Sequence, residues 1–157
     1  MDRLPDLRRH FAFDTWANRE VAAALRALPE PPPGAVKTLA HIAGVLRLWL
    51  ARVKGEPSPL AVWPDLDLEA VARELDAAAV LWRRQIESLK PEDMERDVAY
   101  VNSLGQAWTS TVGDILTQTI FHGVHHRAQI LADLRRAGHE PPYVDFIHAV
   151  RSGRLGG

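Results

Sequence analysis

The spacing of apolar residues constrains this chain more than any other feature. Along most of its 157 residues they recur every three or four positions, which places them on one face of an α-helix. The pattern predicts long helices over residues 4–28, 36–53, 67–89 and 111–137, with prolines or glycines at most of their ends. The second of these stretches is apolar nearly all round, so we expect it to be the most buried helix.

The connections between these stretches carry their own signals. Residues 54–66 form a loop marked by prolines, and Asp67 is a good N-cap for the helix that follows it. Residues 97–108 lack a helical stripe and predict two short extended arms around a turn. Thr111 followed by Asp114 has the spacing of a capping box, which predicts the start of the last long helix.

Four long helices with one longer cross-connection are typical of a four-helix bundle. The sequence therefore predicts an all-α fold in which the longer connection, between the third and fourth helices, contains a short hairpin. Residues 143–150 predict a final helical turn or two. We expect a single domain over residues 1–157, because neither a repeat nor a change of composition divides the chain.

Composition excludes several classes of function. The formal net charge is −1, whereas non-specific binding to nucleic acid needs a basic face. No apolar run approaches the roughly 20 residues of a membrane span. The chain is charged from Asp2 onward and has no apolar signal core. We therefore expect a cytoplasmic protein that binds neither nucleic acid nor membranes.

The chain has seven histidines and no cysteine, so any metal site must use nitrogen and oxygen donors. The last long helix contains His122, His125 and His126, and residues three or four apart share a helical face. Counting about 100° per residue places His126 nearest the apolar face, His122 further round and His125 almost opposite. A site that faces the interior therefore favours His122 with His126. His41, in the most buried helix, is the candidate for a third ligand.

Three histidines would leave coordination positions open for water or substrate, as in catalytic metal sites. The alternative is that His41 is a core residue whose ring nitrogens are satisfied by other groups. Glu-x-x-His, His-Glu-x-x-His, P-loop and nucleophile-elbow patterns are all absent. A nucleophile would therefore have to come from bound water or from a bound substrate.

Across nearly the whole chain, the sequence resembles the DinB/YfiT-like metal-binding four-helix-bundle proteins. The matching segments follow the order expected for that family: Trp16-Ala17-Asn18, Leu39-Ala40-His41-Ile42, Trp49-Leu50-Ala51-Arg52, Gly105, Thr111-Val112-Gly113-Asp114 and His122-Gly123-Val124-His125-His126-Arg127-Ala128-Gln129-Ile130. The resemblance implies that His41, His122 and His126 bind zinc or nickel. Ala128 stands where the family often has glycine, which we expect to affect packing and not ligation.

The resemblance also implies a homodimer and a small-molecule reaction. Some relatives are thiol S-transferases or isomerases that use low-molecular-weight thiols such as bacillithiol or mycothiol. In such a reaction the metal would favour the thiolate of the cosubstrate. The alternatives are a non-catalytic or stress-related metal-binding dimer, a metal-dependent hydrolase and a plain helical bundle. The candidates for substrate contacts are Trp16, Trp49, Tyr100 and Trp108, with Arg127 as the candidate for a catalytic residue or an anion partner.

Overall fold

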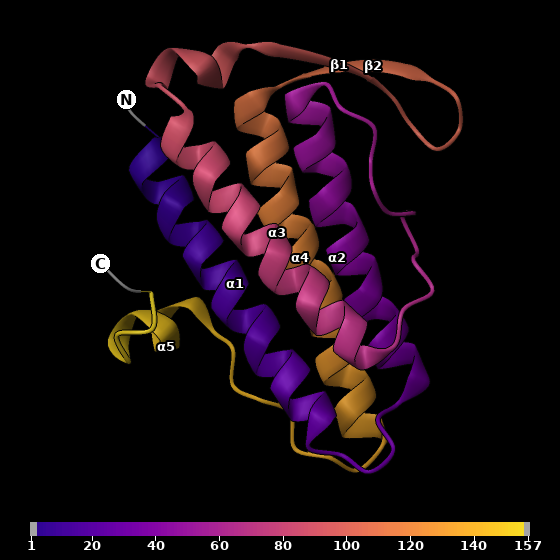
Figure 1. The fold of residues 1–157 in the computed structure, drawn as a ribbon. Helices are drawn as coiled ribbons and strands as arrows, with labels where there is room; N and C mark the ends of the chain where they lie inside the picture. The colour runs from indigo at the N-terminus through magenta and orange to yellow at the C-terminus, as the bar shows by residue number, and fades with distance from the viewer. Residues whose placement is uncertain (1–2, 156–157) are drawn as a thin grey trace.

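The computed structural model describes residues 3–155, which contain five α-helices, one 3₁₀ helix and two strands. In chain order they are α1 (Leu4–Arg26), α2 (Pro33–Lys54), α3 (Leu68–Ser88), η1 (Pro91–Glu95), β1 (Asp97–Val101), β2 (Ala107–Thr111), α4 (Val112–Arg136) and α5 (Phe146–Arg151). The protein is thus mostly helical with one small sheet. Its four long helices lie alongside one another, an arrangement that is compatible with a four-helix bundle (Figure 1).

The predicted start signals are confirmed. The Asp67 carboxylate accepts a hydrogen bond from the backbone N–H of Ala70 and so caps α3. The Thr111 hydroxyl accepts one from the N–H of Asp114 at the start of α4. The two arms predicted over residues 97–108 are the antiparallel strands β1 and β2, in which Tyr100 lies opposite Trp108.

One element was not predicted. The predicted third helix ends at residue 89, and Pro91, two positions later, begins the 3₁₀ helix η1. Proline suits the first position of a helix because its fixed φ is already helical and its missing N–H would have no partner there.

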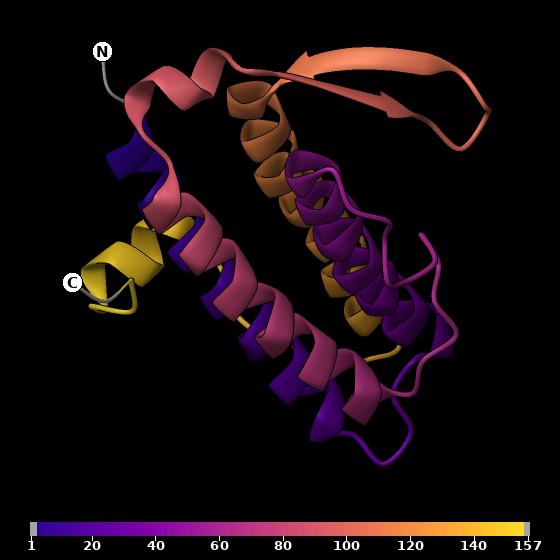
Figure 2. The ribbon, with the colours of Figure 1, turned by 45° about the horizontal axis from the view of Figure 1, so that its top comes forward.

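A second long connection, besides the hairpin, sets the direction of α3. Residues 55–67 run back along the outside of α2, so α3 begins near the end of the assembly where α2 begins (Figure 1). The four long helices form two pairs, α1 with α3 and α2 with α4, as the turned view shows (Figure 2). Residues 55–67, called the return loop below, therefore lie against the α2–α4 pair and contact His41.

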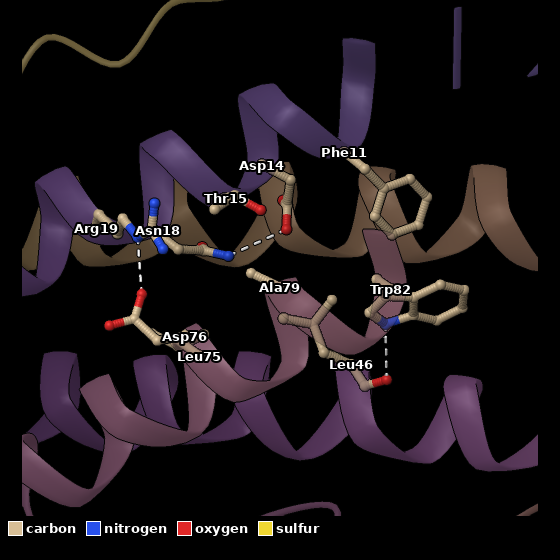
Figure 3. Close-up of a pocket in the computed structure, with 10 residues that line it drawn as sticks. All are labelled: Phe11, Asp14, Thr15, Asn18, Arg19, Leu46, Leu75, Asp76, Ala79 and Trp82. Carbon is tan, nitrogen blue, oxygen red and sulfur yellow. Dashed lines mark hydrogen bonds and ion pairs between the residues drawn. The ribbon is translucent and has the colours of Figure 1, made fainter. Parts of the chain in front are cut away.

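The apolar stripes of the four long helices meet in one core, which includes Trp82, Leu39 and Ile130. The indole N–H of Trp82 donates to the carbonyl of Leu46 at 3.0 Å, so this buried polar atom is satisfied (Figure 3). A smaller cluster, centred on Phe13, holds α5 against α1. Within residues 3–155, no helix combines the length and the hydropathy needed to cross a membrane.

Candidate metal centre

Three histidine side chains from two helices converge between α2 and α4. His41 lies on α2, whereas His122 and His126 lie about one turn apart on α4. One ring nitrogen of each lies within 4.8 Å of the others, and the Nε2 atoms of His41 and His122 are 3.0 Å apart. Two nitrogens on one tetrahedral zinc ion lie about 3.4 Å apart. The predicted cluster is therefore present, and its donors are compatible with binding one metal ion.

Hydrogen bonds fix which nitrogen two of these rings present. The Nδ1 of His41 lies 2.8 Å from the carbonyl oxygen of Val62, and the Nδ1 of His126 lies 2.8 Å from the amide Oε1 of Gln129. Both oxygens are acceptors, so each Nδ1 carries the hydrogen and donates it. The Nε2 atoms of His41 and His126 are therefore the unprotonated nitrogens, and that of His41 accepts a hydrogen bond from the Nε2 of His122 at 3.0 Å. Outer partners of this kind orient metal-binding histidines.

The surroundings of the cluster keep two of the imidazoles neutral. Burial, followed by the proximity of His126 and His41, lowers the pKa of His122 to about 3. Burial also lowers the pKa of His41, although the hydrogen bond to Val62 acts in the opposite direction. Because an imidazole must be neutral to bind a metal ion, these two rings are available as ligands at neutral pH.

The return loop covers one face of His41. The indole of Trp63 stacks on the imidazole with ring centroids 3.8 Å apart and planes 8° from parallel, while the Trp63 side chain remains 51% exposed. The loop can lie this close because residue 44 is glycine. A Cβ at that position would lie 2.6 Å from the carbonyl oxygen of Ala61 and 2.8 Å from that of Val62. Gly44 is therefore needed for the contact that orients His41.

We expect Gly44→Ala to weaken zinc binding by about tenfold, the lower end of the effect of losing an outer hydrogen-bond partner. The added methyl group would push the loop, and with it the Val62 carbonyl, away from His41. Competition with a zinc-chelating dye measures the affinity. Gly34→Ala is the matched control, because it lies on the same helix and its added Cβ would meet nothing closer than Asp133 Oδ2 at 3.7 Å. Equal affinities in the two variants would show that the loop contact does not tune the site.

A buried ion pair holds the histidine-bearing turn of α4 against α1. Arg127 Nη1 donates to Asp14 Oδ1 at 2.5 Å and to Asn18 Oδ1 at 2.8 Å, and the charged side chains are only 3% and 4% exposed. Gly123 makes room for this contact, because a Cβ there would collide with the Asp14 carboxylate. Gly123 and Arg127, which follow His122 and His126 in the sequence, thus hold α4 against α1, while the two imidazoles face α2.

The structure does not bring the other predicted site residues to the histidines. Trp49 and Tyr100 pack edge to face, with centroids 5.2 Å apart, beneath the Arg52 guanidinium near the end of α2. Trp108 is 55% exposed on β2, and Trp16 packs beside α5. Among residues 3–155, none of these four rings makes a recorded contact with the three-histidine cluster. Their role in substrate binding stays a prediction.

Arg127 has an internal partner, the Asp14 carboxylate, in place of the anionic ligand suggested for it. Its position on α4 buries the guanidinium between the helices. Its proposed catalytic role also stays a prediction.

Sequence reasoning missed the contacts of four residues that shape the site. Gln129 follows His126 by three positions, a spacing that places both on one helical face. Asp14 and Asn18, four apart in an otherwise apolar stripe, signal a buried polar partner. Trp63 lies in a loop without periodicity, so no sequence pattern connects it with His41.

Most of the chain is similar in sequence to known proteins. A model of the DinB family matches residues 11–153. Among curated proteins, "Protein DinB" of Bacillus subtilis (strain 168) is 22% identical over 152 residues, which cover 87% of this chain and 88% of that protein. No solved structure gives a significant match.

Proposed function

This chain belongs to the DinB family, and we propose that it is a four-helix bundle that acts as a metal-dependent thiol S-transferase. The observation that carries the proposal is the convergence of His41, His122 and His126. Three protein ligands leave at least one coordination position for a cosubstrate, whereas purely structural sites are usually closed by four. Imidazole donors suit zinc or nickel, which are the ions we propose.

Different residues of the chain would bind the ion, orient its ligands and shield the site. His41, His122 and His126 would hold the ion, and the Val62 carbonyl and Gln129 set the tautomers of two of them. When bound, the ion would supply Lewis acidity that lowers the pKa of a thiol. The indole of Trp63 shields one face of His41, and because Trp63 is 51% exposed a substrate could contact it.

The sulfur in this reaction must come from a cosubstrate, because the chain contains no cysteine. We propose a low-molecular-weight thiol as that cosubstrate and a small electrophile as its partner. With an aryl chloride, the sulfur forms a C–S bond as the C–Cl bond breaks, and chloride and the thiol proton are released. This substitution of chloride by sulfur requires neither an oxidant nor a reductant.

The proposal is tested with 1-chloro-2,4-dinitrobenzene and a panel of thiols: bacillithiol, mycothiol, glutathione and N-acetylcysteine. We expect zinc- or nickel-loaded protein to accelerate thioether formation, measured by absorbance, with at least one thiol. The rate should return to that of the protein-free reaction after chelation and in His126→Ala.

Further electrophiles, such as an epoxide and an activated alkene, extend the screen. Failure of every thiol and electrophile with metal-loaded protein would overturn the transferase proposal. It would favour a non-catalytic metal-binding role, since the ion would still bind.

A further inference from the structure

A groove of about 570 Å³ lies between α1 and α3, the pair of helices that carries none of the three histidines. The last described residues of the chain, Arg154 and Leu155, close one side of it. Ligand sites for small molecules typically occupy about 300–1,000 Å³, so the groove is large enough to hold one.

Positive charge is concentrated in this groove. Five arginines line it, against one carboxylate, that of Glu87: Arg8, Arg9, Arg19, Arg83 and Arg154. Arg19 is paired with Asp76, 2.7 Å away (Figure 3). The other four arginines form no ion pair with any residue of the described range 3–155. The whole chain has a net charge of only −1, so this excess of arginine belongs to the groove and not to the protein as a whole.

The interior of the groove is apolar and aromatic. Phe11, Trp82 and Ile86 reach it from the core between the helices, and Val80 adds a partly exposed aliphatic side chain. Trp16 forms part of the wall, and its indole N–H is buried without a hydrogen-bond partner in the described part of the chain. An aromatic or aliphatic group would fit this lining, and arginines at its edge would hold an acidic group.

We propose that this groove binds a small amphiphilic anion, whose apolar body lies on the aromatic lining and whose carboxylate, sulfonate or phosphate contacts the unpaired arginines. A free small molecule suits the site better than a membrane surface, because the apolar groups line a concavity and do not project from it. The groove is formed by other helices than the histidine cluster. Binding here should therefore be independent of the metal ion.

The test uses 8-anilinonaphthalene-1-sulfonate as the probe and its fluorescence enhancement as the readout, with the full chain at neutral pH. We expect saturable binding of one probe per chain, unchanged by chelation of metal. Arg83→Gln should weaken it by about tenfold or more, as expected for the loss of a charged hydrogen bond. Arg84→Gln is the matched control, because Arg84 is an exposed neighbour on α3 that does not line the groove. Cooperative urea unfolding of both variants checks that the fluorescence reports the folded protein.

Three results would overturn the proposal. They are non-saturable probe binding by the wild type, an equal loss in Arg83→Gln and Arg84→Gln, and equally tight binding of the uncharged probe N-phenyl-1-naphthylamine. Co-sedimentation with phosphatidylglycerol vesicles separates the two sources of an anionic group. Arg83-dependent binding to vesicles without saturable binding of the free probe would replace the small anion with a membrane surface.

Discussion

Stoichiometric zinc binding is expected to be lost in His41→Ala, with the affinity falling by more than about 100-fold. Removing an outer partner of a metal ligand costs about 10–100-fold, and removing the ligand itself should cost more. The two imidazoles left on α4, those of His122 and His126, would hold the ion without a donor from α2. Metal analysis of purified protein, combined with a competition titration, measures both stoichiometry and affinity.

His125→Ala is the matched control for this experiment. His125 is adjacent to the cluster and is exposed on α4, yet it does not belong to the group of three converging nitrogens. We expect this variant to keep one ion per chain. Full zinc binding by His41→Ala, or absence of zinc from the wild type, would contradict the assignment of the site.

Asp14→Ala is expected to lower the free energy of unfolding by about 3–5 kcal/mol, the usual cost of leaving one partner of a buried ion pair uncompensated. Arg127 would keep one hydrogen bond, to Asn18 Oδ1, but it would lose its only recorded carboxylate partner among residues 3–155. Its Nη2 atom already lacks a hydrogen-bond partner there, so the described residues offer little compensation. Urea unfolding monitored by tryptophan fluorescence measures the change.

The control for Asp14→Ala comes from the same region. Asp76 pairs with Arg19 at 2.7 Å, but both side chains are more than half exposed. Exposed pairs contribute about 0–1 kcal/mol, so Asp76→Ala should change stability far less. Asp14 and Asp76 line the same pocket (Figure 3), but the Asp14 side chain is buried and that of Asp76 is exposed. Similar losses in the two variants would show that the buried pair is not a special source of stability.

Periodicity predicted the parts of this molecule that depend on one helix at a time. The spacing of His122 and His126 places them on one face whatever the helix packs against. The apolar surroundings of His41 in the sequence predicted its burial, which is confirmed at 6% exposure. The same local reasoning predicted the caps at Asp67 and Thr111, because a cap contacts only its own first turn.

Contacts between distant segments could not be predicted in this way. The oxygen that orients His41 belongs to the backbone of Val62, and a carbonyl leaves no mark on the sequence. The stacking of Trp63 depends on the path of the return loop, which Gly44 permits through the absence of a side chain. The partner of Arg127 comes from another helix, 113 positions earlier in the chain.

The division of the ligands between two helices determines when the site can exist during folding. His122 and His126 need only α4, so a single isolated helix already offers two imidazoles. His41 is 81 positions away from His122, and bringing it into place requires closing that length of chain and docking α2 on α4. An ion held by all three rings would bind the docked state in preference to the open one and so stabilise it in proportion to its affinity. A bound metal ion would therefore stabilise the docking of α2 on α4, and the occupancy of the site would report whether the two helices are docked.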